Sequence, residues 1–339
     1  MGMKKFFLSL LSVATMFAMT SCSQDLNLPS GEEALVTITA NLGEIGSRAT
    51  EISDGKKVNE VAWAVYLKDT PTPLPNLVGT LPITDKAGEL TLRLTTGRSY
   101  DIALFAYHTE TPCTAQVLGE AKPQYYQVDW NNKKICLQYP SGQIANDTDD
   151  RDCFCFVRKA LDVNGQISET FTLKRPLAQL NFGSSKEDYE AAVNAGVVVT
   201  HSSIVAKTYT QYDLFEQKCL DTDMSEFEFK MNAVPNQMLS VAVDKNNPEA
   251  LTDFHYLGTV YLLVNNNQLQ DGVKLTVYET KNNVQAAVNT VEFGNVPFEP
   301  NWRTNIIGNV LTDAASFNII VDDKFANHHN LDEDGNELK

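Results

Sequence analysis

The feature that most constrains the fold of this chain is an alternation of apolar and polar residues with a period of two. Over residues 35–42, Val36, Ile38, Ala40 and Leu42 alternate with polar side chains. Because successive side chains of a strand point to opposite faces of a sheet, this pattern predicts a half-buried strand. Similar runs recur between turn residues, without the long amphipathic helices that a βαβ fold needs. The sequence therefore predicts an all-β fold.

The expected strands form two sets that meet near Pro176. Proline has no amide hydrogen to donate to a neighbouring strand, so pairing should be interrupted there. At about 150 residues per domain, 339 residues suggest two domains. We expect an N-terminal β-sandwich over 34–175 and a C-terminal one over 176–325, with one helix at 186–195. The expected strands run over 35–42, 61–67, 90–94, 102–107, 126–130, 134–139, 153–157 and 170–173, then 178–182, 197–206, 209–215, 227–233, 239–243, 256–264, 273–278, 286–293 and 317–321.

The amino terminus predicts export. Two lysines precede an apolar run at 6–19 that is too short to cross roughly 30 Å of hydrocarbon, so residues 1–21 are expected to be a signal peptide. The run ends in Met-Thr-Ser-Cys, which resembles a bacterial lipobox and makes Cys22 the expected lipidation site. Several acyl chains anchor a protein stably without a spanning helix. The alternative is an ordinary signal peptide followed by a coincidental cysteine.

The charge of the chain excludes some partners. Lysines and arginines number 27 against 43 aspartates and glutamates, which gives a formal net charge of −16. Such a charge repels phosphate backbones and anionic lipid headgroups, so neither nucleic-acid binding nor membrane attachment through a basic patch is expected. Residues 326–339 are expected to form an acidic tail, because the glycine at 335 comes too early for an EF-hand loop.

Residues 147–152 hold a cluster of acids around Arg151. Its members are Asp147, Asp149, Asp150 and Asp152. Calcium prefers oxygen ligands of this kind, but a polar, solvated loop is the favoured interpretation.

The remaining cysteines are Cys113, Cys136, Cys153, Cys155 and Cys219. Their number is odd in an oxidising compartment, so at least one thiol stays unpaired in a monomer. The histidines form no recognisable metal-ligand set with them. Buried structural thiols are the favoured interpretation, with a disulfide or a metal site as alternatives.

The motifs of common catalytic sites are absent from the sequence. There is no Gly-x-Ser-x-Gly, Walker loop, Gly-x-Gly-x-x-Gly or His-Glu-x-x-His. No enzyme activity, cofactor or metal is therefore predicted. Trp63, Trp130 and Trp302 could form a platform that stacks on sugars, but their strand-like surroundings favour packing in a core.

Four segments besides the lipobox carry a family resemblance. They are GSRAT at 46–50, VNEVAWAVY at 58–66, KRPLAQLNFG at 174–183 and NWRTNIIGNVL at 301–311. Together they resemble the fimbrillin-type, type V pilin-like lipoproteins of Bacteroidia, some of which are known only as domains of unknown function. The resemblance spans nearly the whole chain and implies two tandem transthyretin-like β-sandwich domains.

The resemblance also implies a route of assembly. In the pilin members, an arginine-specific protease removes the first strand after export, and a strand of another subunit fills the exposed groove. The matching bond here joins Arg48 to Ala49, so cleavage would release a lipidated segment, 22–48, that carries the strand at 35–42. Loss of its inward side chains would make on the order of 6 kcal/mol of burial available to a donor strand.

A candidate donor is the strand of Phe317, Ile319 and Val321, provided that it can detach. It could equally be an ordinary edge strand, and Arg48 could be a plain loop residue. The partners implied are other fimbrial subunits, in a homo- or heteropolymer, and the outer membrane through the lipid anchor, with a host protein or glycan as a further candidate.

The function predicted from these observations is that of a non-enzymatic, surface-exposed outer-membrane lipoprotein, either a fimbrial subunit or an accessory protein or adhesin. The rival prediction is a monomeric surface lipoprotein that binds glycans. A third is a carboxylate-dependent glycoside hydrolase on a sandwich scaffold.

Overall fold

The chain is built almost entirely of β-strands. The computed structural model describes residues 31–42, 55–138, 144–145, 149–231, 233–242, 251–312, 317–323 and 327–331. One α-helix lies among them, α1 (Lys186–Asn194), whose N-cap Ser185 accepts a hydrogen bond from the Asp188 amide. No helix in these ranges is long and apolar enough to cross a membrane. The predicted all-β sandwich class is confirmed.

The first pair of sheets is formed by strands before residue 174. A three-stranded sheet has the order β11–β1–β4, and a five-stranded sheet has the order β10–β5–β2–β3–β6. Their facing side chains form one apolar core, in which alternate residues of each strand point inward. The strands are β1 (Glu33–Leu42), β2 (Glu60–Leu67), β3 (Val78–Pro82), β4 (Ala87–Thr95), β5 (Arg98–Tyr107), β6 (Val117–Leu118), β10 (Phe154–Val163) and β11 (Ile167–Leu173).

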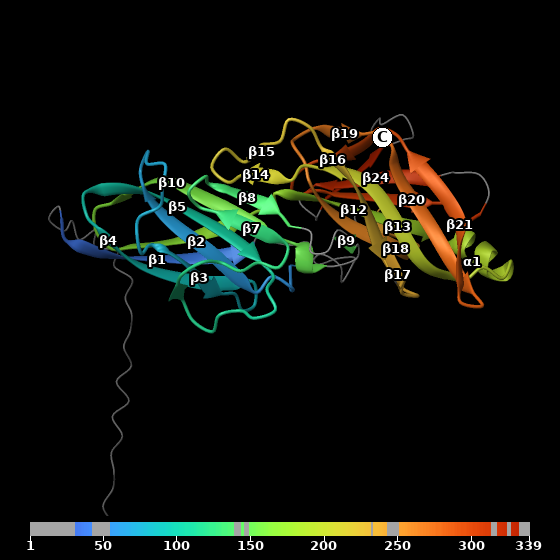
Figure 1. Cartoon of the computed structure of the whole chain (residues 1–339), viewed down its shortest axis with the longest axis horizontal. Helices are drawn as coiled ribbons and strands as arrows, with labels where there is room; N and C mark the ends of the chain where they lie inside the picture. Colours follow the sequence, from blue (N-terminus) through green and yellow to red (C-terminus); the bar gives the residue numbers. More distant parts are fainter. Residues whose placement is uncertain are drawn as a thin grey trace, which may run out of the picture.

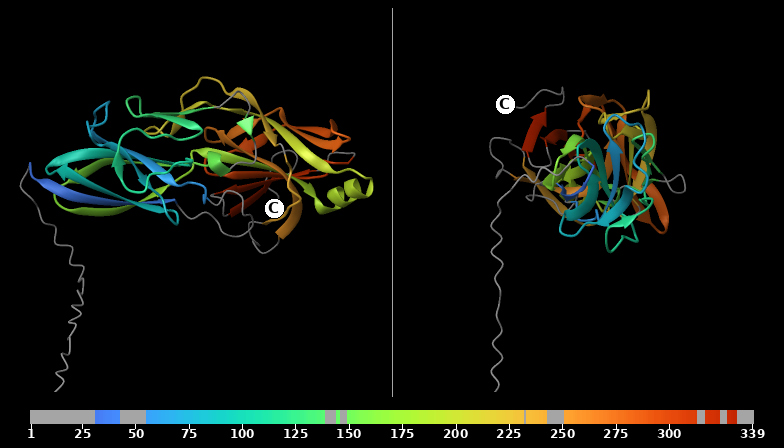
Figure 2. Two further views of the ribbon diagram at one scale, coloured as in Figure 1. Left: turned by 60° about the horizontal axis from the view of Figure 1, so that its bottom comes forward. Right: turned by 90° about the vertical axis from the view of Figure 1, so that its left-hand side faces the viewer.

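The second pair of sheets contains six and five strands, in the orders β17–β18–β12–β23–β24–β25 and β21–β20–β13–β16–β9. A second core lies between them. Figures 1 and 2 both place β1 toward one end of the long axis and α1 at the other. The strands are β9 (Ile144–Ala145), β12 (Leu177–Ser185), β13 (Val199–Thr208), β16 (Ser225–Met231), β17 (Met238–Ala242), β18 (Leu251–Leu263), β20 (Val273–Lys281), β21 (Val284–Phe293), β23 (Arg303–Gly308), β24 (Phe317–Asp323) and β25 (Asn327–Leu331), with β19 (Gln268–Gln270) and β22 (Val296–Phe298) as a separate two-stranded sheet.

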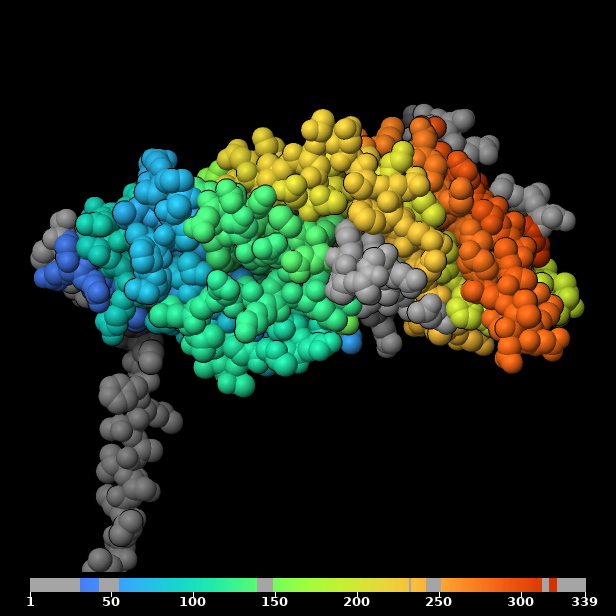
Figure 3. All heavy atoms as spheres, viewed as in Figure 1, coloured from blue at the N-terminus to red at the C-terminus, as the bar shows by residue number. Residues whose placement is uncertain are grey.

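A four-stranded sheet joins the two ends of the molecule. Its order is β15–β14–β8–β7, so it takes two strands from each side of residue 176. Tyr212 pairs with Ile135 across the β14–β8 contact, and Figure 3 shows the green residues near 130 against the yellow residues near 215. The strands are β7 (Tyr126–Asp129), β8 (Lys134–Leu137), β14 (Gln211–Asp213) and β15 (Lys218–Cys219).

This sheet covers a third cluster, which we call the junction core. It packs on the face of β2 and β5 that points away from β1, and it is completed by residues of β12 and β18. The proposed boundary near residue 176 therefore falls beside a shared apolar core. Its buried members are Ala62, Ala64, Tyr66, Ala103, Phe105, Tyr107, Tyr126, Trp130, Ile135, Cys153, Cys155, Leu177, Tyr212, Leu214, Phe215, Cys219, Tyr261 and Leu263.

Eight strands lie where the sequence predicted none: β3, β6, β9, β15, β19, β22, β23 and β25. β23 is a central strand, parallel to β12, and all six of its residues are buried, so it shows no alternation. β25 lies inside the range 326–339, which was expected to be only an acidic tail, and pairs antiparallel with β24.

Candidate functional site: the groove that holds β1

β1 is the central strand of its sheet. It runs antiparallel to β4, from Glu33 opposite Thr95 to Asn41 opposite Ala87. On its other side it runs parallel to β11, with Val36 opposite Ile167. Among the described strands, no other pairs with both β4 and β11, so removing β1 would leave the facing edges of these two strands with unpaired backbone groups.

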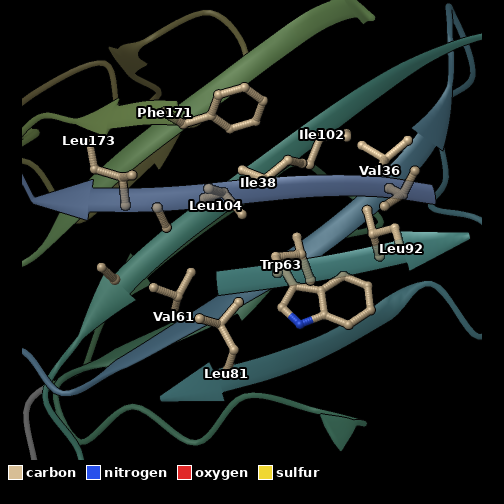
Figure 4. Close-up of a cluster of buried hydrophobic side chains, with 14 of the residues drawn as sticks. Val36, Ile38, Val61, Trp63, Leu81, Leu92, Ile102, Leu104, Phe171 and Leu173 are labelled. Carbon is tan, nitrogen blue, oxygen red and sulfur yellow. The ribbon is translucent and has the colours of Figure 1, made fainter. Parts of the chain in front are cut away.

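The inward side chains of β1 close the N-terminal core. Val36, Ile38, Ala40 and Leu42 are all at most 2% exposed, as the alternation predicted. Ala34 is buried on the same face and was missed, because the expected strand began one residue after it. Figure 4 shows Val36 and Ile38 within the same cluster of side chains as Ile102, Leu104 and Phe171.

The burial of β1 sets the free energy available in the groove. When β1 occupies the groove, two alanines (Ala34 and Ala40) and three larger aliphatic side chains (Val36, Ile38 and Leu42) are removed from contact with water. At about 25 cal/mol per Å² of apolar surface, this burial contributes on the order of 7 kcal/mol, as an upper estimate. Without β1, the groove would be an apolar slot flanked by two unpaired strand edges. A site of this kind can bind an extended peptide, which pairs with the edges and buries its apolar side chains.

The groove is also shaped by a glycine of β4. Gly88 lies opposite Ala40, and a Cβ atom added to it would come within 2.4 Å of Leu81 Cδ1. The absence of a side chain at Gly88 therefore lets Leu81 and Pro82 of β3 pack closely against β4.

The predicted processing residues fall outside this description. Cys22, Arg48 and Ala49 lie outside the described residues, as does the signal peptide. In sequence, Arg48 comes six positions after Leu42, where β1 ends.

The candidate donor residues are placed in the C-terminal core. Phe317, Ile319 and Val321 belong to β24, which pairs with β23 on one side and β25 on the other. Ile319 and Val321 are 5% and 3% exposed, and Phe317 packs against the Phe293 ring at 4.7 Å. β24 is thus an integral strand of its own chain here, and it would have to leave this core in order to serve another subunit.

The acidic cluster at 147–152 contains a buried ion pair that the sequence did not predict. Asp152 is fully buried, and its two carboxylate oxygens accept hydrogen bonds from Arg175 Nε at 2.7 Å and Nη2 at 2.8 Å. The Arg175 guanidinium lies 4.3 Å from the centre of the Phe154 ring. Burial raises the pKa of Asp152 to about 6, while Arg175 opposes this change.

The expectation of a solvated loop is therefore wrong for Asp152. The expectation agrees better with Asp150, which is partly exposed and whose Oδ1 lies 3.7 Å from Lys57 Nζ. Asp149 accepts a hydrogen bond from the Tyr261 hydroxyl at 2.8 Å, and Asp147 lies outside the described residues. A single sequence offered no sign of the partner, because Arg175 is 23 residues from Asp152.

The cysteines of the described chain are free thiols. Cys153, Cys155 and Cys219 are buried in the junction core, and Cys113 and Cys136 are half-buried. Burial raises the pKa of Cys155 and of Cys219 to about 12, so their thiolates are strongly disfavoured. In the described ranges, no three or more His, Cys, Asp or Glu side chains are grouped to hold a metal ion. The buried-thiol interpretation is confirmed for these three residues.

The tryptophans do not form a surface platform. Trp63 is fully buried in the N-terminal core and Trp130 is 8% exposed in the junction core. Trp302 is half-buried beside the C-terminal core. The interpretation as core residues is confirmed for Trp63 and Trp130, so a sugar-stacking surface built on these two rings is not available.

Comparisons with known proteins give one family and several distant likenesses. A family model described as a family of unknown function (DUF6562) matches residues 30–338. No curated protein gives a significant match.

Three of the similar solved structures illustrate the likenesses. A Bacteroides ovatus protein provisionally assigned to cell adhesion is 12% identical, with a TM-score of 0.46 over 85% of this chain and 96% of that one. A Bacteroides thetaiotaomicron protein provisionally assigned to polysaccharide binding (DUF1812) is 13% identical, with a TM-score of 0.45 over 89% and 99%. The tip fimbrial protein Mfa3 of Porphyromonas gingivalis, truncated at its C-terminus, is 9% identical, with a TM-score of 0.42 over 86% and 99%. With TM-scores below 0.5, these likenesses leave the function open.

Proposed function

The chain belongs to DUF6562, a family of unknown function, and we propose that this member is a surface lipoprotein whose first strand is removed so that a strand of another subunit can take its place. In this proposal Cys22 carries the lipid anchor at the outer membrane, and cleavage between Arg48 and Ala49 releases residues 22–48. The product is a fimbrial subunit, or an accessory protein or adhesin of the same class.

The observation that carries the proposal is the position of β1. A strand that ends six residues before an arginine fills a fully apolar groove between β4 and β11. Its removal opens the groove along its whole length, because β1 contributes both the inward side chains and the backbone partners of two strands. Such an exposed slot favours association with any extended segment of matching pattern.

The donor proposed for this groove is β24 of another copy. Its alternation of Phe317, Ile319 and Val321 matches the period of the groove. Leaving the C-terminal core costs β24 the burial of these side chains, so the exchange is favourable only if the groove of the next subunit returns a comparable burial. Release of β24 would break its pairing with both β23 and β25, and β25 is the edge strand of the sheet.

The experiment is cleavage of the purified chain by an arginine-specific protease, followed by size-exclusion chromatography and electron microscopy. The proposal predicts release of the segment that ends at Arg48 and the growth of oligomers. The matched control is Arg48→Lys, which keeps the positive charge but removes the protease site. Trimming at residue 48 without any assembly would contradict the proposal.

A second variant tests the donor. Cysteines placed at 307 and 318, which are paired positions of β23 and β24, should form a disulfide that holds β24 in its own chain. We expect this lock to block assembly after cleavage, and reduction of the disulfide to restore it. Assembly at full rate in the oxidised variant would exclude β24 as the donor.

A further inference from the structure

A polar hollow lies on the side of the molecule away from β1. It has a volume of about 510 Å³, which falls in the range of about 300–1,000 Å³ that is typical of small-ligand sites. Five separate segments meet there: the end of β2, the start of β5, the β7–β8 turn, the middle of β10 and the β14–β15 turn. The hollow therefore combines residues from both sides of residue 176.

Asp101 of β5 forms part of the wall of this hollow. It lies on the same face of β5 as Ala103 and Phe105, which belong to the junction core, and so points away from β1. Its side chain is 7% exposed, and its Oδ1 accepts a hydrogen bond from the Ala160 amide at 2.8 Å. Within the described residues, Oδ2 has no hydrogen-bond partner and the carboxylate has no ion pair.

A β-bulge in β10 lies beside Asp101 in the same sheet. β10 pairs with β5 at Arg158 and again at Leu161, so Lys159 and Ala160 together oppose Asp101. Ala160 has a φ of 54°, in the left-handed region that is costly for a residue with a Cβ atom. Because of the bulge, the Ala160 amide can donate a hydrogen bond to the Asp101 carboxylate. The neighbouring Lys159 lines the hollow, and its Nζ lies 3.3 Å from Glu216 Oε1.

Lys133 is fixed in the wall by three contacts. Its Nζ donates a hydrogen bond to the Thr70 carbonyl at 2.8 Å, and it lies 4.3 Å from the centre of the Phe215 ring and 5.0 Å from that of Tyr66. The adjacent Asn131 and Asn132 also line the hollow. Amide groups both donate and accept hydrogen bonds, which widens the set of hydroxyl orientations that the site can satisfy.

The charge of the lining selects the class of ligand. Four acids and two lysines surround the hollow, and among its lining residues only Pro71 and Phe215 are apolar. A strongly anionic ligand is disfavoured because acids outnumber lysines in the lining, and the two lysines reduce the attraction for a strongly cationic one. A neutral ligand with many hydroxyl groups can donate to the carboxylates and accept from the ammonium and amide groups. We propose that this hollow binds a short, neutral oligosaccharide, with Asp101 as its central hydrogen-bond acceptor.

This site does not depend on strand exchange. The face of β5 that carries Asp101 is opposite the core that β1 closes, so the hollow stays the same whichever strand fills the groove. The binding test therefore uses the intact Arg48→Lys chain, which keeps β1. A failure of the assembly proposal and a failure of the binding proposal are then distinct results.

The test is saturation-transfer NMR of the intact chain with maltotriose, cellotriose, mannotriose, galactotriose and xylotriose, followed by calorimetry with the strongest binder. Asp101→Asn keeps the acceptor for the Ala160 amide but removes the charge, and should weaken binding about tenfold or more. Lys159→Met, on the exposed rim, should weaken binding roughly threefold without affecting the fold. The matched control is Asp162→Asn, which makes the same change at an exposed acid of β10 that accepts a hydrogen bond from Ser99.

Three results would overturn the proposal. One is that none of the five trisaccharides binds the intact chain. Another is that a trisaccharide binds but Lys159→Met and a folded Asp101→Asn chain keep the full affinity. The third is that Asp162→Asn weakens binding as much as Asp101→Asn, which would place the ligand elsewhere. If Asp101→Asn fails to fold, the comparison between Lys159→Met and Asp162→Asn decides the question.

Discussion

Replacing Ile38 by alanine should loosen the hold of β1 on its groove far more than replacing Thr37. Ile38 is fully buried opposite Leu90, so the change removes three carbon atoms from the core. At about 0.8 kcal/mol each, their transfer to water costs about 2.4 kcal/mol, and the cavity left behind brings the loss to about 3 kcal/mol. Thr37 points to the opposite face and is half-buried, so Thr37→Ala should change the stability by about 0.5 kcal/mol or less.

The assay follows the segment that ends at Arg48 after the chain has been nicked there. A loss of 3 kcal/mol corresponds to roughly a 100-fold weaker association, most of it in the rate of dissociation. Ile38→Ala should therefore release the segment about 100-fold faster than the unmodified chain, whereas Thr37→Ala should stay within about threefold. Equal release rates for the two variants would refute the argument that buried side chains of β1 hold it in place.

Two further changes test other parts of the structure by urea denaturation. Gly88→Ala should destabilise the chain by about 1–3 kcal/mol, because the new Cβ atom would meet Leu81 at 2.4 Å; an unchanged midpoint would contradict this contact. Asp152→Asn should cost about 3–5 kcal/mol because it leaves Arg175 buried without a counter-charge, whereas the double variant Asp152→Leu, Arg175→Met should recover much of the loss.

Local alternation was sufficient to predict β1 and its inward face. The pattern at 35–42 matches β1 to within two residues at its start, because this strand has one buried and one more exposed face. The same reasoning failed for β23, where Arg303, Thr304 and Asn305 are buried in a central strand. Some of their polar groups have distant partners, such as the Gln179 side chain that accepts from Arg303 Nε at 2.8 Å, whereas Asn305 Nδ2 has no hydrogen-bond partner among the described residues. A strand such as β23, which is buried on both faces and carries polar residues, shows neither an alternation nor a continuous apolar run.

Contacts between distant parts of the chain were the other limit. The pairing of β8 with β14 joins residues about 75 positions apart, such as Cys136 and Gln211, and neither short strand carries a sign of its partner. The hollow around Asp101 depends on this pairing, since the β7–β8 and β14–β15 turns both line it. The sequence therefore predicted the inward face of β1, which is a local feature of one strand, and did not predict the hollow, which five segments assemble.

The most direct test of the central claim is a competition between strands for the emptied groove. The chain is nicked at Arg48, the released segment is removed, and assembly is followed by light scattering in the presence of a synthetic peptide with the sequence of β1, residues 33–42. The account predicts that this peptide blocks assembly, and that a peptide with serine at positions 36, 38 and 42 does not, because only the first can refill the apolar slot. Assembly that proceeds equally with either peptide would contradict the claim that the groove vacated by β1 is where subunits join.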